Sequence, residues 1–424
     1  PDMYGPKTET TGALPMRPAA ALAPVLAPVL ALAAALAALP ASADPDPADW
    51  DAVLEEARGQ TVWFNAWGGS AQANDFIAWA GERVARDHGV TVAHVKLSDT
   101  ADAVSRVIAE KAAGTDAGAA VDLVWINGPN FAAMKEQGLL FGPWAEQLPN
   151  WALVDPAANA ALTADFTVPT GGLEAPWAMA QVVFWHDTAH VPDPPRSMPA
   201  LLDWAAANPG RFAYPQPPDF LGATFLKQAL IELAPDPVVL SGPAEAADYA
   251  AATAPLWAFL DALTPLLWRE GRAYPATGEA VKPLLADGEV DLALSFSPGA
   301  ASAAIANGEL PDTVRSYVLD GGTIGNASFL AIPYNASAKA GAMVLANFLM
   351  SPEAQLRMQD PAVLGWGTVL AMDRLAPDEA AAFAALDLGI ATLSPAELGP
   401  ALPEPHPSWM TRVAQDWVAR YGTK

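Results

Sequence analysis

The sequence has no cysteine and few basic residues. Its 424 residues include 22 Lys and Arg against 47 Asp and Glu, which gives a formal net charge of −25 at pH 7. Without cysteine the chain forms no disulfide and offers no thiol for lipid attachment, nucleophilic catalysis or a zinc knuckle. A surface this acidic repels nucleic acid and anionic lipid and favours a neutral or cationic ligand. Acidity also serves solubility, so the charge alone identifies no ligand.

The first 43 residues have the layout of an export signal. Arg17 follows Met16, and no charged residue then occurs between positions 18 and 43. This run is almost wholly Ala, Leu, Val and Pro, and it ends in Ala-Ser-Ala at 41–43, a small-x-small cleavage pattern. We therefore expect cleavage after Ala43 and release of a mature chain into the periplasm.

Two other interpretations of this segment stay open. The apolar run is long for a signal core, so an uncleaved membrane anchor is the rival, although Pro24, Pro28 and Pro40 suit a membrane span poorly. Translation from Met3 instead of Met16 is the second alternative. Beyond the signal, no apolar run is long enough to span a bilayer.

The stretch 61–70, T-V-W-F-N-A-W-G-G-S, predicts a strand that turns into a helix. Gly68 and Gly69 allow a tight turn, Ser70 is a good helix N-cap, and apolar residues then recur at helical spacing from 73 to 84. A helix N-terminus at the carboxyl end of a strand is where open α/β folds bind ligands. An ordinary turn without a ligand has the same pattern.

Two more predicted strands, at 90–95 and 121–126, alternate with helices. This order indicates a parallel sheet with right-handed crossovers. Extended runs at 174–185 and 314–319 predict a crossing into a second domain and a crossing back. The chain beyond residue 43 is too long for one ordinary core.

We therefore expect a discontinuous domain with an insertion. Lobe 1 should comprise residues 44–173 and 320–424, the second part including the C-terminal helices. Lobe 2, with the crossing strands, should comprise residues 174–319. Residues 1–43 are upstream sequence and signal.

Known catalytic patterns are missing from the sequence. There is no G-x-S-x-G elbow, P-loop lysine or G-x-G-x-x-G turn. His186 and His190 have zincin spacing, but Asp187 replaces the glutamate, and the pair follows a predicted strand whereas the motif needs a helix. We expect no metal, no cofactor and no catalytic residue. Carboxylate separation cannot be read from a sequence, so a periplasmic hydrolase with a glycosidase-like acid pair is the alternative function.

Loops at the predicted strand ends are instead rich in aromatic, Asn, Ser and Gly residues. Amides and hydroxyls orient a ligand, while aromatic faces cover its apolar or cationic surface. The candidate ligand-binding residues are Trp67, Gly68, Gly69, Ser70, Asn127, Asn130, Trp177, Tyr214, Phe220, Ser297 and Asn326. Core packing is the alternative role for each aromatic residue among them.

Seven segments of the chain carry a family resemblance: W-F-N-A-W-G-G-S at 63–70, V-D-L-V-W-I-N-G-P-N-F-A-A-M-K at 121–135, E-A-P-W-A-M-A-Q-V-V-F at 174–184, N-P-G-R-F-A-Y-P-Q-P-P-D-F-L-G at 208–222, G-T-I-G-N-A-S-F-L-A-I-P-Y-N-A at 322–336, A-N-F-L-M-S-P-E-A-Q at 346–355 and E-P-H-P-S-W at 404–409. With these segments the chain resembles the extracellular solute-binding proteins of bacterial ABC importers, and most closely their YnjB-like group of periplasmic components. Ala178 stands where the group usually has glycine, a small departure.

The resemblance implies a two-lobed α/β fold, with two mainly parallel sheets flanked by helices and joined by two crossing strands. A small-molecule ligand would be enclosed between the lobes by hinge closure. The closed form, a monomer, would then dock on membrane permease subunits energised by a cytoplasmic ATPase. The resemblance implies no enzymatic activity.

Related branches of the family carry polyamines, thiamine, sugars, inorganic anions or ferric iron. Iron is disfavoured here because the sequence has no Tyr-Tyr pair. Helix N-termini at Ser70 and Asn130 suit an anionic or hydroxyl group, whereas the acidity and the 15 Trp suit a cation. A thiamine-like compound, or another organic cation or zwitterion, satisfies both.

Overall fold

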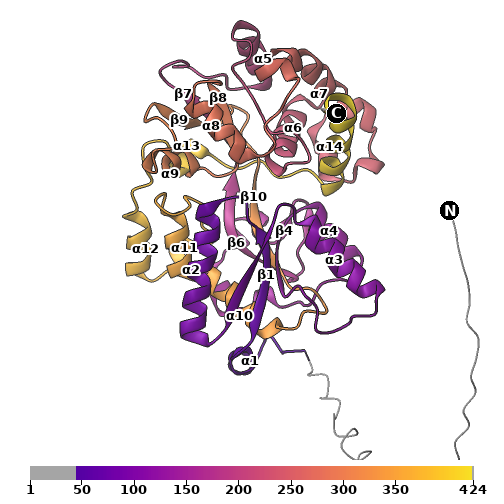
Figure 1. Cartoon of the computed structure of the whole chain (residues 1–424), viewed down its shortest axis with the longest axis vertical. Helices are drawn as coiled ribbons and strands as arrows, with labels where there is room; N and C mark the ends of the chain where they lie inside the picture. The colour runs from indigo at the N-terminus through magenta and orange to yellow at the C-terminus, as the bar shows by residue number, and fades with distance from the viewer. Residues whose placement is uncertain (1–43, 423–424) are drawn as a thin grey trace, which may run out of the picture. The chain divides into compact units, whose positions relative to one another are not determined.

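The larger sheet has five strands in the order β2-β1-β3-β10-β6. It belongs to a computed structural model that describes residues 44–422 (Figure 1). Its strands are β1 (Thr61–Trp67), β2 (Thr91–Leu97), β3 (Leu123–Ile126), β6 (Glu174–Gln181) and β10 (Gly325–Ala331). β1 pairs in parallel with β2 and β3, but β10 is antiparallel to both β3 and β6. The sheet is therefore mixed, because β10 enters it on the way back from the other lobe.

The second sheet has three strands in the order β8-β7-β9. β7 (Val183–Asp187) is antiparallel to both β8 (Leu292–Ser295) and β9 (Val314–Tyr317). The prediction of two mainly parallel sheets is thus wrong in this respect. β7 runs away from the larger sheet and β9 leads back toward it, so the two must run in opposite directions.

The opening turn is built as its sequence predicts. Helix α2 begins directly after Ser70, whose hydroxyl accepts the backbone N–H of Ala73 at 3.3 Å, and Gly89 ends the helix with a positive φ of 70°. Figure 1 shows α2 on one side of the larger sheet and α3 with α4 on the other. The helices around this sheet are α1 (Trp50–Ala57), α2 (Ala71–His88), α3 (Ala101–Ala112), α4 (Pro129–Glu136), α10 (Lys339–Leu349), α11 (Pro352–Gln359) and α12 (Pro377–Ala384).

Separate buried cores define the two lobes. Phe64, Phe131 and Phe329 lie in the core of lobe 1, whereas Phe184 and Phe225 lie in the main core of lobe 2. A smaller third core lies on the other face of the three-stranded sheet. The helices around this sheet are α5 (Met198–Ala207), α6 (Phe220–Leu233), α7 (Tyr249–Leu263), α8 (Val281–Ala286), α9 (Ala300–Ala306), α13 (Pro395–Leu398) and α14 (Pro407–Tyr421).

The C-terminal helix α14 belongs to lobe 2, although its position in the sequence placed it with lobe 1. Trp409, Val413 and Trp417 are buried in the same core as Tyr214 and Phe225. In Figure 1 the yellow α14 accordingly lies beside α6 and α7. The helical spacing of its apolar residues identified a buried face, but spacing does not reveal which core receives that face.

The chain passes between the lobes along three neighbouring segments. Val182 joins β6 to β7, and the chain returns from β9 to β10. The third segment precedes α14, where Leu402 forms a parallel bridge with Ile324. The side-chain amide of Gln181 donates to the hydroxyl of Thr323 and to the carbonyl of Leu398, at 3.3 and 3.2 Å. A third connection therefore accompanies the two predicted crossings.

No helix within residues 44–422 has the length and apolar character needed to cross a membrane. The predicted signal segment and its cleavage after Ala43 lie outside the described residues.

Candidate functional site between the lobes

The turn after β1 lies at the boundary between the lobes. A side chain at Gly69 would place its Cβ 2.4 Å from the indole of Trp67, and one at Gly68 would lie 2.6 Å from Lys96 Cβ. Both positions therefore require glycine for space. Together with Ser70, the turn forms one wall of a cavity of about 440 Å³ whose other wall is α8 of lobe 2.

Side chains of both lobes meet across this cavity. Gln72 Nε2 donates to Glu309 Oε1 at 3.3 Å. Lys282 Nζ lies 2.9 Å from Glu309 and 3.0 Å from Glu279. The N-terminus of α2 thus faces a region that holds more carboxylates than cations, and this disfavours a free anion there.

Four indole rings gather at the carboxyl end of the larger sheet, and we call them the indole cluster: Trp67, Trp125, Trp177 and Trp366. The ring of Trp125 lies 5.0 Å from Trp177, 5.4 Å from Trp366 and 6.3 Å from Trp67, centroid to centroid. Trp177 is buried and its Nε1 has no hydrogen-bond partner among the described residues, whereas the other three rings are half-buried. Trp67 and Trp177 both meet Trp125 edge to face, the arrangement that aromatic pairs prefer.

Lobe 2 adds aromatic and polar groups at the same boundary. Phe220, the first residue of α6, is 37% exposed and packs edge-on against Phe296 with a centroid distance of 5.6 Å. Ser297 Oγ donates to the carbonyl of Gly365 in lobe 1 at 3.2 Å, and the N–H of Gly299 donates to the same oxygen at 3.1 Å. The two lobes are therefore in direct contact at this point.

A buried ionic cluster joins both lobes and the C-terminal segment. Lys227 of α6 is 1% exposed, and its Nζ lies 2.6 Å from Glu404 Oε2. Glu404 Oε1 accepts a hydrogen bond from Asn326 Nδ2 at 2.9 Å. The ammonium also lies 4.3 Å from the ring centroid of Phe166, in lobe 1, and 5.1 Å from that of Phe220. Two ring faces and a carboxylate form a typical environment for an ammonium group.

Two further carboxyl groups are buried beside this cluster. Asp165 is 0% exposed; its Oδ2 accepts the backbone N–H of Gly128 at 2.5 Å, and burial raises the pKa of Asp165 to about 8. Glu174 has no hydrogen-bond partner for either oxygen among the described residues, and burial raises its pKa well above the usual value. Carboxyl groups thus outnumber the one ammonium group, and burial favours their neutral forms.

The structure brings most of the predicted site residues to this boundary. Trp67, Gly68, Gly69 and Ser70 form the turn beside the cavity, and Trp177 belongs to the indole cluster. Near the ionic cluster lie Asn127, Phe220 and Asn326, while Ser297 bridges to lobe 1.

Two predicted residues have other positions. Tyr214 is 0% exposed in the core of lobe 2, where it stacks on Phe225 at 4.4 Å and accepts a hydrogen bond from Trp417 Nε1 at 2.9 Å. Asn130 is half-buried but does not cap α4, because the helix begins at Pro129 after Gly128, whose φ is 55°. Tyr214 is thus an aromatic residue at a strand end that packs in the core of lobe 2 and does not reach the boundary.

Sequence reasoning missed several residues that the structure places at this boundary: Trp125, Asp165, Phe166, Lys227, Phe296, Trp366 and Glu404. One signal was available for Lys227, which together with Gln228 interrupts the apolar residues of α6. The zincin-like histidines lie at the end of β7 and beyond it, and no group of three metal-ligating side chains occurs in the described part of the chain.

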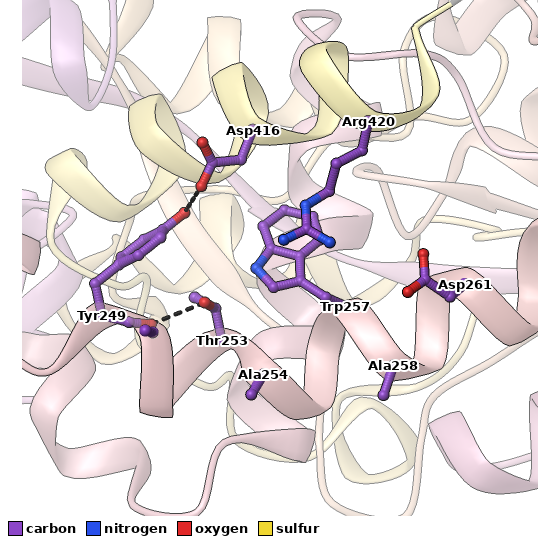
Figure 2. Close-up of a pocket in the computed structure, with 9 residues that line it drawn as sticks. Tyr249, Thr253, Ala254, Trp257, Ala258, Asp261, Asp416 and Arg420 are labelled. Carbon is purple, nitrogen blue, oxygen red and sulfur yellow. Dashed lines mark hydrogen bonds between the residues drawn. The ribbon is translucent and has the colours of Figure 1, made fainter.

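A groove between α7 and α14 lies on lobe 2 alone (Figure 2). Its polar groups are already engaged, since Tyr249 donates to Asp416 at 2.7 Å and the guanidinium of Arg420 lies 4.5 Å from the ring centroid of Trp257. The groove brings together no groups from the two lobes. The boundary between the lobes is therefore the better candidate site.

Residues 79–370 match the family described as bacterial extracellular solute-binding protein. The chain is 44% identical over 376 residues to Protein YnjB of Escherichia coli (strain K12), covering 89% of this chain and 95% of that protein. Among solved structures, it resembles a putative spermidine/putrescine ABC transporter from Listeria monocytogenes, with a TM-score of 0.60, 16% identity and coverage of 85% and 98% of the two chains.

A second similar structure is the periplasmic binding protein AfuA from Actinobacillus pleuropneumoniae with fructose-6-phosphate bound. Its TM-score is 0.60 at 13% identity, with coverage of 86% of this chain and 99% of AfuA. At such identities the structures share the fold alone. The family match and the 44% identity show more than the fold: this chain belongs to the bacterial extracellular solute-binding proteins, so it is a solute-binding protein and not an enzyme.

Proposed function

We propose that the chain captures an organic cation or zwitterion between its two lobes and delivers it to permease subunits in the membrane. A thiamine-like compound, which joins a cationic group to flat rings, has the expected chemistry. The mature protein, a monomer beginning at Asp44, would act in the periplasm. Lobe 1 would comprise residues 44–181 and 325–384, and lobe 2 would comprise 182–319 together with the C-terminal segment that includes α13 and α14.

The environment of Lys227 is the observation that supports this ligand class most. Its ammonium already lies against a carboxylate and two aromatic faces contributed by both lobes. The same boundary also contains the indole cluster and two buried carboxyl groups that lack a cation. Rings and acids in this combination favour an organic cation over a sugar or a phosphate.

Closure follows from contacts with both lobes. A solute that touches the indole cluster on one side and Phe220 and Phe296 on the other binds the closed form better than the open form. It therefore shifts the population toward closure. Permease subunits would then select the closed form.

Native mass spectrometry of the protein purified from its own periplasm tests the proposal. We expect a bound organic cation or zwitterion that is lost on unfolding, because an enclosed solute dissociates slowly. Added thiamine, choline and putrescine should be screened by thermal shift, since a ligand at 100 times its dissociation constant adds about 2.7 kcal/mol of stability. A bound sugar or sugar phosphate would contradict the proposed class.

A pair of tryptophan variants locates the bound solute. Trp366→Ala removes a ring of the indole cluster and should weaken binding of the active cation about tenfold. Trp63→Ala is the matched control, because Trp63 lies on β1 outside the cluster and is 47% exposed. Equal affinities of the two variants would argue against the indole cluster as a binding surface.

A further inference from the structure

A short hairpin of lobe 1 carries three features that folding alone does not explain. The hairpin consists of β4 (Ala164–Asp165) and β5 (Val168–Pro169), with Phe166 and Thr167 at its tip. Phe166 has a positive φ of 54°, a strained conformation for a bulky residue. Asp165 Oδ1 and Thr167 Oγ1 are buried and have no hydrogen-bond partner among the described residues. Strain and unpaired polar atoms of this kind concentrate at functional sites.

Asp165 and Lys135 fasten the hairpin to α4, Asp165 through one of its two carboxyl oxygens and Lys135 through the carbonyl of Pro169. Asp165 Oδ2 accepts the N–H of Gly128, just before α4, and Asn127 lies beside the carboxyl group. A Cβ at Gly128 would lie 2.8 Å from the ring of Phe166, so glycine there makes room for the strained residue. These contacts position the carboxyl group but leave its second oxygen unused.

The charges around Asp165 do not balance once its carboxyl group ionises. Lys227 of α6 and Glu404 of the C-terminal segment lie close enough to affect its pKa, but Lys227 is paired with Glu404 at 2.6 Å. Glu174 of β6 is a further buried acid in the neighbourhood. Against the effect of burial, the charge of Lys135 of α4 lowers the pKa of Glu174, but the Lys135 ammonium donates to the carbonyl of Pro169. When Asp165 is ionised, the group around it therefore lacks one positive charge.

We infer that Asp165 is the specificity-determining residue that receives the cationic group of the solute. Its Oδ1 accepts a hydrogen bond from an ammonium or protonated-amine N–H, and the hydroxyl of Thr167 provides a second acceptor. This assignment rests on the proposed function, which it deepens by naming the residue and the kind of group it recognises: a cation with at least one N–H donor. A hydrogen bond between a cation and a buried carboxylate is stronger than the same hydrogen bond in water.

Proton release is the signature of this assignment. Because the pKa of Asp165 is raised to about 8, the free protein holds this carboxyl protonated at pH 7. An arriving cation favours the ionised form, so binding at pH 7 should release close to one proton. A purely structural carboxyl group would release none.

The test compares wild type, Asp165→Asn and the exposed control Asp116→Asn by isothermal titration of thiamine and putrescine, in buffers of different ionisation enthalpy. We expect wild type and the control to bind with proton release. Asp165→Asn should bind at least about tenfold more weakly and release no proton. Equal affinity of Asp165→Asn and wild type, within about twofold, would overturn the assignment while leaving the proposed function intact.

Stability separates recognition from a structural role. The raised pKa of Asp165 means that its contribution to stability is complete below about pH 4 and is lost as the pH rises to about 8. Asp165→Asn removes this loss, so its melting temperature at pH 7 should not fall below that of wild type. A large fall would indicate a structural residue.

Two measurements test the assignment even if the Asp165→Asn variant does not fold. Thr167→Val should weaken binding with the fold intact, and wild type alone should release the proton. Wild type that binds a cation at pH 7 without proton release would also overturn the assignment. If wild type binds neither probe and carries no organic cation from its periplasm, the proposed ligand class fails and the assignment falls with it.

Discussion

Replacing Lys227 with methionine is expected to lower the free energy of unfolding by about 3–5 kcal/mol, because the substitution leaves Glu404 buried without its cation. Methionine keeps most of the volume of the lysine stem, so the loss reports mainly on the charge. Urea denaturation of residues 44–424 at pH 7, followed by tryptophan fluorescence, measures the change.

A second substitution distinguishes an ion pair from simple packing. Lys227→Met combined with Glu404→Gln removes both charges, and the double variant should recover much of the stability that the single variant loses. Lys111→Met, in an exposed position, should change stability by no more than about 0.5 kcal/mol. A double variant no more stable than Lys227→Met alone would mean that the pair does not act as a unit.

Gly299→Ala is expected to prevent full closure of the lobes. The added Cβ would lie 2.3 Å from the carbonyl oxygen of Gly365, in the other lobe, and 2.7 Å from its Cα. Gly299 itself has an ordinary φ of −89°, so alanine fits its backbone conformation and lobe 2 should fold normally. A closed form that is harder to reach lowers the apparent affinity, here by about tenfold or more.

Titration of the cation that wild type binds, together with the melting temperature of the free protein, checks this result. Gly242→Ala is the matched control, because a Cβ there meets only Val239 O at an ordinary 3.9 Å. We expect Gly299→Ala to lose affinity with an unchanged melting temperature. Unchanged affinity would show that solute binding does not depend on the contact between Gly299 and Gly365.

Local features of the fold could be predicted from the sequence, and features that depend on distant pairing could not. The strand and helix around Ser70 follow from a turn, a cap and a helical repeat, which all lie within one short stretch. The direction of β10 depends instead on where the chain re-enters the larger sheet. The lobe to which α14 belongs depends on which core its tryptophans fill. No local pattern encodes the direction of β10 or the placement of α14.

The candidate site follows the same division. Trp67 and Ser70 stand at a strand end, where open α/β folds bind ligands, and so they could be identified. Lys227 and Glu404 are 177 residues apart and become partners only in the folded chain. Asp165 lies in a two-stranded hairpin too short for periodicity to identify.

A crystal structure of the protein with its bound organic cation tests the central claim most directly. We predict the solute between the indole cluster of lobe 1 and Phe220 with Phe296 of lobe 2, in contact with both lobes. A solute bound to one lobe alone, for example in the groove between α7 and α14 (Figure 2), would contradict the account.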